Sequence, residues 1–399
     1  MATLGGPFWR FWGASALANV GDGIRVSAFP LLAAALSGDP VAVAAVAAAQ
    51  FLPWLVTGVF AGALADRHAT RTMLTVADTA RIVVLAVLTA TVATGTATVT
   101  LVVVAAFVLG AGETLRDTAA QTAVPRLVPD RLLERANGRL VAGEIVGNEF
   151  VGPPVGALLF VVGAALPFAV NGAALALAVM LVLSVPLTLR RVPGGAPGGD
   201  PAVLAGLRWL LRHSVLRTLA VVVAAVAAAD SAWFAIFVLY AQNRLGLGAV
   251  GFGLLLATGA AGGLVGSLAA ERLVARFGHR HVLTWSMAVT AGAPTLLIAV
   301  ADRAVAVAVV VTSSAAFAVL NVAVLALRQR LVPDGLLGRV TAATRVLTYG
   351  GTALGALAGG ALAAGLGAEA PFVFSGVVAI AATVAWYVVS ARPTGNATR

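Results

Sequence analysis

The 399-residue sequence contains no cysteine and no lysine, and it has only four histidines. The absence of cysteine excludes disulfides, thiol catalysis and cysteine-ligated metal sites. No acidic cluster of the kind that a metal site needs accompanies the histidines, which are His68, His213, His279 and His281. The sequence also has neither a phosphate-binding P-loop nor a paired nucleophile and base. We therefore expect no enzyme activity, no cofactor and no ATP-driven pumping.

Charge is scarce too, because only 11% of the residues are charged while 60% are hydrophobic. A soluble protein contains about 45–50% apolar residues, so lipid must be the solvent for much of this chain. The net charge of +10 comes entirely from arginine. These arginines lie singly or in short clusters between apolar segments rather than on one polar face, which argues against nucleic-acid binding.

The apolar residues form twelve segments, each near the length of about 20 residues that a membrane helix requires. The sequence therefore predicts an all-α integral membrane protein with twelve transmembrane helices. The apolar run that follows Arg10 is about twice as long as the apolar core of a signal peptide. We therefore expect the first segment to stay in the mature protein as a helix. The segments cover residues 9–36, 41–65, 72–94, 98–122, 137–161, 165–189, 215–242, 248–271, 281–301, 304–327, 340–364 and 370–391.

The loops between these segments alternate in charge. One set carries most of the arginines, whereas the other set offers only Arg244 and Arg303. The positive-inside rule places the arginine-rich loops in the cytoplasm. We therefore expect a multi-pass protein of the bacterial inner (plasma) membrane with both termini in the cytoplasm.

A stretch rich in proline and glycine, residues 190–201, predicts a flexible linker in the middle of the chain. The following segment, Ala202 to His213, has Arg208 and Arg212 one turn apart and predicts a short helix on the inner membrane surface. The expected organisation is a six-helix bundle over residues 1–189, a cytoplasmic linker over 190–213 and a second six-helix bundle over 214–399.

The two halves resemble each other in sequence. The tetrapeptide LVPD at Leu127–Asp130 recurs about 204 residues later at Leu331–Asp334, each time followed by a leucine pair and an arginine. A similar offset aligns Gly62 with Gly266. Two parallel six-helix repeats are typical of membrane transporters.

The loop after the second segment, GALADRHATRTML, resembles the loop signature between helices two and three of the major facilitator superfamily. The departures from that signature are Ala69 and Thr70. The resemblance to the superfamily covers the whole chain. Within the superfamily, NVGDGI near Asp22, FLPWLVTGVFAGALADR before the loop and AVPRLVPDRLLERANGRL from Ala123 resemble the macrolide-exporter branch of twelve-helix drug/proton antiporters. The residues that match the loop signature include Gly62, Asp66, Arg67 and Arg71.

The fifth segment contains a set of glycines and a proline similar to the helix motif of exporters in this superfamily: Gly147, Gly152, Pro153 and Gly156. The spacing between Gly147 and the Gly-Pro pair is one residue longer than in that motif. The resemblance favours export. A purely structural alternative also exists, because glycines allow close helix approach and proline kinks a helix in any bundle.

Carboxylates inside the apolar segments are the candidate coupling residues. A charge at the bilayer centre costs about 2.5–3.5 kcal/mol, so each needs a partner or a function. Asp22, Glu149 and Asp230 lie near the predicted midplane and are our candidates for proton or substrate coupling. Arg25 lies one turn after Asp22, so the alternative for Asp22 is a neutral pair that only holds its helix in place.

Further charges lie closer to the predicted cytoplasmic side. Glu113, Arg116 and Asp117 fall in the fourth segment, Asp78 and Arg81 fall in the third, and Glu144 falls in the fifth. Together with Arg25, they could form structural ion pairs or contribute to a substrate path.

The residues and the resemblance together predict an exporter of hydrophobic or amphiphilic small molecules that exchanges its substrate for protons. The expected partners are the small molecule, protons and membrane lipids, and the protein is expected to be a monomer. Two alternatives stay open at this point: a metabolite uptake permease of the same fold, and a membrane receptor or assembly factor that does not transport.

The resemblance also implies a cytoplasmic gate, in which the Asp66 carboxylate contacts Arg345 at the start of the eleventh segment. In the alternative, Asp66 caps its turn while Arg67 and Arg71 contact lipid phosphates. If the gate exists, Asp66→Asn lowers transport into vesicles but leaves the protein level and substrate affinity nearly unchanged. Transport equal to that of the wild type would contradict the gate.

Overall fold

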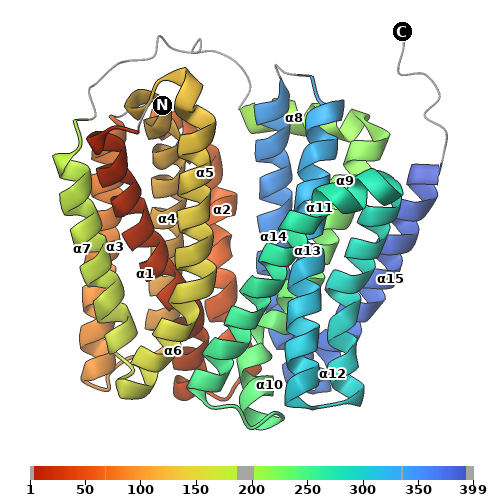
Figure 1. Ribbon diagram of the computed structural model, residues 1–399. Helices are drawn as coiled ribbons and strands as arrows, with labels where there is room; N and C mark the ends of the chain where they lie inside the picture. The colour runs from red at the N-terminus through yellow and green to blue at the C-terminus, as the bar shows by residue number, and fades with distance from the viewer. Residues whose placement is uncertain (1–3, 68, 187–201, 334–335, 392–399) are drawn as a thin grey trace. The chain divides into compact units, whose positions relative to one another are not determined.

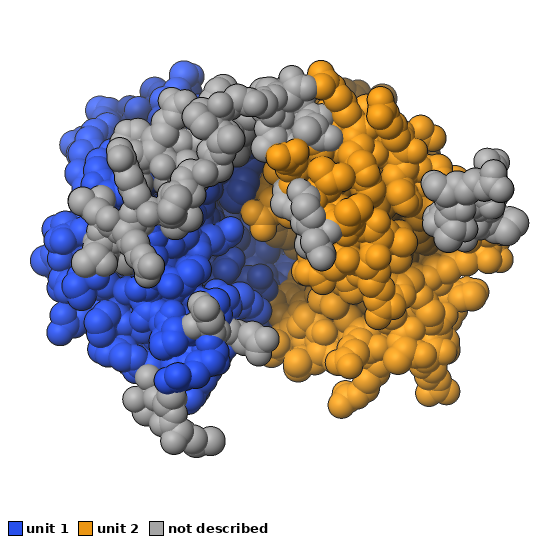
Figure 2. Space-filling model, turned by 90° about the horizontal axis from the view of Figure 1, so that it is seen from above, with its two compact units in different colours: residues 1–198, 241–257 blue, residues 199–240, 258–399 orange. Residues whose placement is uncertain are grey.

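The computed structural model describes residues 4–67, 69–186, 202–333 and 336–391, and every regular element in these ranges is a helix (Figure 1). The side chains of residues 56–67, 130, 134, 202–205, 337 and 338 lie outside the description. Two compact units make up the chain (Figure 2). Unit 1 comprises Met1–Gly198 and Ala241–Ala257, and unit 2 comprises Gly199–Tyr240 and Thr258–Arg399.

The helices of the first half follow the apolar segments closely. They are α1 (Gly6–Leu36), α2 (Pro40–Arg67), α3 (Thr70–Ala93), α4 (Val99–Leu127), the 3-10 turn η1 (Asp130–Leu132), α5 (Leu133–Glu144), the π-helix η2 (Ile145–Val151), α6 (Gly152–Val162) and α7 (Leu166–Ser184). In unit 1, α1 packs against α6 and α7, and α4 packs against α2 and α3.

The predicted linker, residues 190–201, lies outside the described residues. The second half begins with a helix where the sequence predicts one, and its position on the membrane surface stays a prediction. The elements of this half are α8 (Ala202–Arg212), α9 (Ser214–Ala235), α10 (Phe237–Asn243), α11 (Ala249–Gly292), the 3-10 turn η3 (Ala293–Thr295), α12 (Leu296–Ala299), α13 (Arg303–Leu331), α14 (Leu337–Leu366) and α15 (Ala370–Ala391). α11 is interrupted at Gly278, whose φ of 76° lies in the left-handed region that favours glycine.

Among the described residues, nine helical stretches are long and apolar enough to cross a membrane. One of them, Ala249–Ala299, has 51 residues. At about 1.5 Å per residue it is far longer than the roughly 30 Å of a bilayer core, and the break at Gly278 divides it. The protein is therefore a multi-pass helical membrane protein, as expected, whereas the number twelve and the two six-helix repeats stay predictions.

A row of small residues lets α14 approach α9 in unit 2. Three glycines of α14 face α9, and a side chain on any of them would meet a backbone carbonyl of α9, so glycine is required for this approach. Small residues four apart on each of two helices are a common means of close packing in membranes, where the hydrophobic effect does not drive helices together. The facing pairs are Gly351 and Ala224, Gly355 and Ala228, and Gly359 and Ala232.

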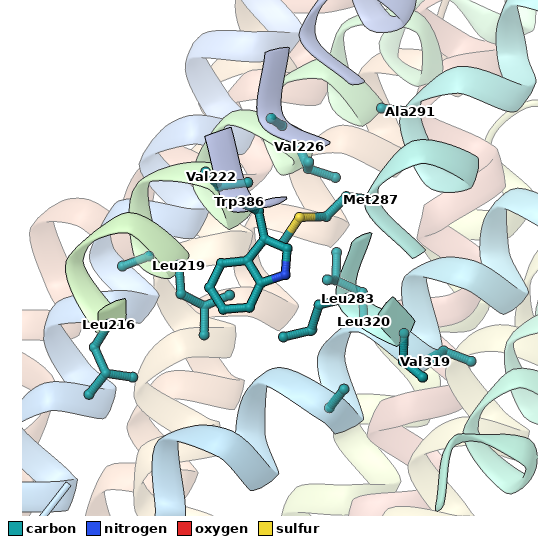
Figure 3. Close-up of a cluster of buried hydrophobic side chains, with 14 of the residues drawn as sticks. Leu216, Leu219, Val222, Val226, Leu283, Met287, Ala291, Val319, Leu320 and Trp386 are labelled. Atoms are coloured by element: carbon teal, nitrogen blue, oxygen red, sulfur yellow. The ribbon is translucent and has the colours of Figure 1, made fainter. Parts of the chain in front are cut away.

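The core of unit 2 lies beside this crossing, around Trp386 of α15 (Figure 3). Its indole is 2% exposed and packs among aliphatic side chains from α9, α11 and α13, including Val222, Met287 and Leu320. The indole Nε1 donates a hydrogen bond to the Arg280 carbonyl at 3.3 Å, so the polar end of this large side chain is satisfied.

The crossing of α9 and α14 generates a stability prediction. We expect Gly355→Ala to lower the free energy of unfolding by about 1–3 kcal/mol, because the added methyl group overpacks against the Ala228 backbone. Gly365→Ala in the same helix is the matched control, since a Cβ there meets open space. Thermal unfolding in detergent measures both variants, and equal midpoints would contradict the close packing.

Candidate functional site

Three helices of unit 1 each carry an acidic residue followed three positions later by an arginine. The pairs are Asp22 and Arg25 in α1, Asp78 and Arg81 in α3, and Glu113 and Arg116 in α4. Residues three apart lie on the same face of a helix. The packing of the three helices brings these faces together.

The six side chains form one chain of alternating charge that runs across the three helices. Asp22 contacts both Arg25, at 3.3 Å, and Arg81. Asp78 in turn contacts Arg81, at 3.5 Å, and Arg116. At the two ends, Arg25 contacts Glu113, and Arg116 donates a hydrogen bond to the Ala14 carbonyl of α1 at 3.2 Å.

This chain of ion pairs is buried within unit 1. The side chains of Asp78 and Arg81 are fully buried, and only Glu113, with 25% of its side chain exposed, approaches the surface of the unit. A charge removed from solvent is tolerated only when it is paired and hydrogen-bonded. The ion pairs therefore join α1, α3 and α4, because each charged side chain is compensated by the oppositely charged side chain beside it.

Gly112 makes room for the centre of this network. It lies in α4, and a side chain there would overlap the Cγ and Cδ atoms of Arg81. Neither the role of this glycine nor the pairing of Asp22 with Arg81 as well as with Arg25 is among the sequence-based predictions. The repeated acid-x-x-arginine spacing in three segments is the pattern that could have indicated it.

The remaining acidic candidates of unit 1 lie outside the chain of ion pairs. Asp117 makes no hydrogen bond or ion pair with the described residues, although the negative charges of Glu113, Asp22 and Glu144 and the positive charge of Arg116 act on it. Glu144 ends α5 with an exposed side chain. Glu149 is exposed as well, and it lies in the π-helix η2.

The π-helix accommodates the extra residue in the exporter-like motif. The Gly152 N–H donates to the Gly147 carbonyl, five residues back, where an α-helix would use four. The lengthened turn places Gly147, Gly152 and Gly156 against α1, where a side chain on any of them would meet the α1 backbone. In addition, Ser27 of α1 donates a hydrogen bond to the Pro153 carbonyl at 2.8 Å. The motif residues therefore lie where η2 and α6 pack against α1.

Asp230 of α9 has a very different environment in unit 2. Its only hydrogen bond with the described residues comes from the indole N–H of Trp233, at 3.1 Å from Oδ1, and no cation pairs with it there. Aromatic rings surround that indole, with centroid distances of 5.0 Å to Phe237 and 5.9 Å to Phe372. Asp230 is thus a carboxyl group in an apolar, aromatic setting.

The residues of the predicted gate are described only in part. Gly62, Asp66 and Arg67 lie near the end of α2, where the side chains are outside the described residues. Arg71 donates a hydrogen bond to the Leu183 carbonyl of α7 at 2.5 Å, and the exposed Arg345 lines a cavity within unit 2. The contact between Asp66 and Arg345 stays a prediction.

The ion-pair chain generates a second stability prediction. Arg81→Gln leaves Asp22 and Asp78 without a shared cation, so we expect the free energy of unfolding to fall by about 3–5 kcal/mol. Arg139→Gln is the matched control, because Arg139 also belongs to unit 1 but has an exposed side chain. The midpoint of thermal unfolding in detergent distinguishes the variants. A midpoint for Arg81→Gln that equals that of the control would show that the network adds no stability.

Known proteins show which family the chain belongs to. The chain is 31% identical over 280 residues to an uncharacterized MFS-type transporter of Sinorhizobium fredii. The match covers 66% of this chain and 65% of that protein, so the chain spans slightly less than two thirds of that relative's length.

Among the described residues, no group of three or more His, Asp or Glu is placed to hold a metal ion.

Solved structures share the fold at low sequence identity. The nucleoside transporter NupG superposes with a TM-score of 0.75 at 13% identity, covering 97% of this chain and 99% of its own. A bacterial homologue of the iron transporter ferroportin superposes with a TM-score of 0.79 at 16% identity, covering 98% and 100%. The transmembrane secretion effector family matches residues 5–398. The protein therefore belongs to this family of the major facilitator superfamily.

Proposed function

We propose that the protein is a secondary transporter that exports hydrophobic or amphiphilic small molecules in exchange for protons by alternating access. The proposal includes twelve transmembrane helices in two repeats, with both termini in the cytoplasm. Family membership supports transport, and the resemblance to exporters supports the direction. The observation that carries the coupling is the environment of Asp230.

Asp230 differs from Asp22, another midplane candidate, in its charge balance. Asp22 is held between Arg25 and Arg81, so its negative charge is already compensated. Among the described residues, Asp230 has only the Trp233 indole as a hydrogen-bond donor. A lone carboxylate in an apolar setting is costly, and it becomes tolerable when it takes up a proton or meets a cationic group. Asp230 is therefore suited to alternate between these two states.

The surrounding residues suit an amphiphilic cargo. The faces of Trp233, Phe237 and Phe372 offer an apolar surface, and aromatic rings also attract cationic groups. A cargo with an apolar body and a positive or hydrogen-bonding group could contact the rings and the carboxylate together. Uptake of a proton by Asp230 would then remove the charge that holds such a cargo.

The paired charges of unit 1 have a different part in this proposal. The chain of ion pairs, which has Glu113 at one end and Arg116 at the other, holds α1, α3 and α4 in fixed register. In this proposal the three helices move as one rigid body. Glu149, exposed on the π-helix, is the second candidate for proton exchange. The driving force is the proton gradient, which supplies about 2.3 kcal/mol per charge for each 100 mV of membrane potential.

Inside-out membrane vesicles test both the direction and the coupling. When the vesicles are energised by respiration, an exporter accumulates a lipophilic fluorescent dye, and we expect Asp230→Asn to reduce this accumulation at least tenfold because the carboxyl group can no longer exchange a proton. Asp302→Asn is the matched control. Asp302 caps α13 by accepting from the Ala304 and Val305 N–H groups, and asparagine caps equally well.

Two results would contradict the proposal in different ways. If wild-type protein accumulates the dye only in right-side-out vesicles, and not in inside-out vesicles, the protein is an uptake permease. Accumulation by Asp230→Asn equal to that of Asp302→Asn would show that Asp230 carries no proton, and the same measurement on Glu149→Gln would then test the second candidate.

A further inference from the structure

A cavity of about 340 Å³ lies within unit 2, among α8, α9, α13 and α14. This volume falls within the range of about 300–1,000 Å³ that is usual for small-molecule sites. Along α9 the cavity reaches as far as Val223, which is seven residues before Asp230, or about 10 Å along the helix axis. The cavity is thus separate from the carboxyl group of the proposed coupling site.

One wall of the cavity is apolar. It is formed largely by α9, and its members Leu216 and Leu219 belong to the buried core of unit 2, where they are 3% and 2% exposed (Figure 3). Val223 continues the same wall one turn further along. An apolar ligand surface can pack there without displacing the core.

The lining that comes from α13 and α14 carries two arginines and several hydroxyl groups. Arg328 comes from α13, and Arg345 comes from α14. Arg328 Nη1 donates a hydrogen bond to the Thr344 hydroxyl at 2.5 Å, which fixes the guanidinium at the cavity. Thr341 and Thr348 line the cavity from the same face of α14, because positions three, four and seven apart share one side of a helix.

The two guanidinium groups carry charge that no described residue neutralises. Neither Arg328 nor Arg345 forms an ion pair with a described residue, and the buried Nε of Arg328 has no hydrogen-bond partner there. The positive charge of Arg345 also acts on Arg328 as a like charge. By contrast, the three buried arginines of unit 1 each contact a carboxylate. A buried donor left unpaired is costly, so a ligand that supplies the acceptor is favoured.

We infer that this cavity binds an anionic amphiphile, with a phosphate or carboxylate head on Arg328 and Arg345 and an apolar body against α9. Guanidinium groups match these heads in geometry, and charge-assisted hydrogen bonds are among the strongest in proteins. The head could belong to a membrane lipid or to a free small molecule, since both present the same chemistry. The inference does not depend on the cargo or direction of transport proposed above.

Calorimetric titration of the full-length protein in dodecyl maltoside tests this inference, with octyl phosphate as the probe. We expect the wild type to bind octyl phosphate at least tenfold more tightly than octyltrimethylammonium, which has the same chain and the opposite charge. Arg328→Gln and Arg345→Gln should each weaken octyl phosphate binding about tenfold or more, because each removes a charged donor. Arg330→Gln is the matched control: Arg330 lies on the same helix as Arg328, but it is exposed and does not line the cavity.

Several outcomes would overturn the inference. They are no binding of octyl phosphate to the wild type, equal binding of the two probes, and equal affinities of the Arg345→Gln and Arg330→Gln variants. Arg345 has an exposed side chain, so its variant decides the matter if Arg328→Gln does not fold. Melting temperatures of all variants establish which of them are folded.

Two further arms distinguish the sources of the anion. In nanodiscs of phosphatidylglycerol, a lipid occupant lowers the wild type's affinity for octyl phosphate relative to nanodiscs of phosphatidylcholine. A free small-molecule anion instead predicts equal affinity in the two nanodiscs and competition by inorganic phosphate.

Discussion

A charged side chain among membrane helices needs an opposite charge close by, and the ion-pair chain of unit 1 meets this requirement with helices that are far apart in sequence. Arg81 is fully buried and lies between Asp22 of α1 and Asp78 of its own helix, while Asp78 also contacts Arg116 of α4. No member can be moved without uncovering a charge. The relative position of the three helices therefore depends on these contacts.

Close packing in both units depends on the absence of side chains. In unit 1, the lengthened turn of the π-helix brings Gly147, Gly152 and Gly156 against the part of α1 that contains Asp22 and Arg25. In unit 2, glycines of α14 meet the backbone of α9. Because lipid gives helices no hydrophobic reason to associate, such backbone contacts and the buried ion pairs together hold the bundles.

Charged side chains that have an opposite charge beside them differ in role from those that do not. The arginines of the unit 1 network all have carboxylate partners, whereas in unit 2 the carboxyl of Asp230 and the guanidiniums of Arg328 and Arg345 have no opposite charge among the described residues. Groups of the second kind are suited to exchange partners, such as a proton, a cargo or a bound anion. The paired charges of unit 1 hold helices in position, whereas the unpaired charges of unit 2 can bind a proton or a ligand.

The sequence by itself determined that the protein is helical and membrane-embedded, because long apolar segments have no other stable form in lipid. It also determined the family resemblance and identified Asp22, Glu149 and Asp230 as exceptional carboxylates. Helical spacing predicted that Arg25 could pair with Asp22, since residues three apart are neighbours whatever the fold. Only the tertiary structure decided that Arg81 also pairs with Asp22, that Gly112 makes room for it, and that Arg328 and Arg345 share a cavity. These contacts depend on how one helix is rotated and shifted against another, and that register is set by packing between helices rather than by spacing along any one of them.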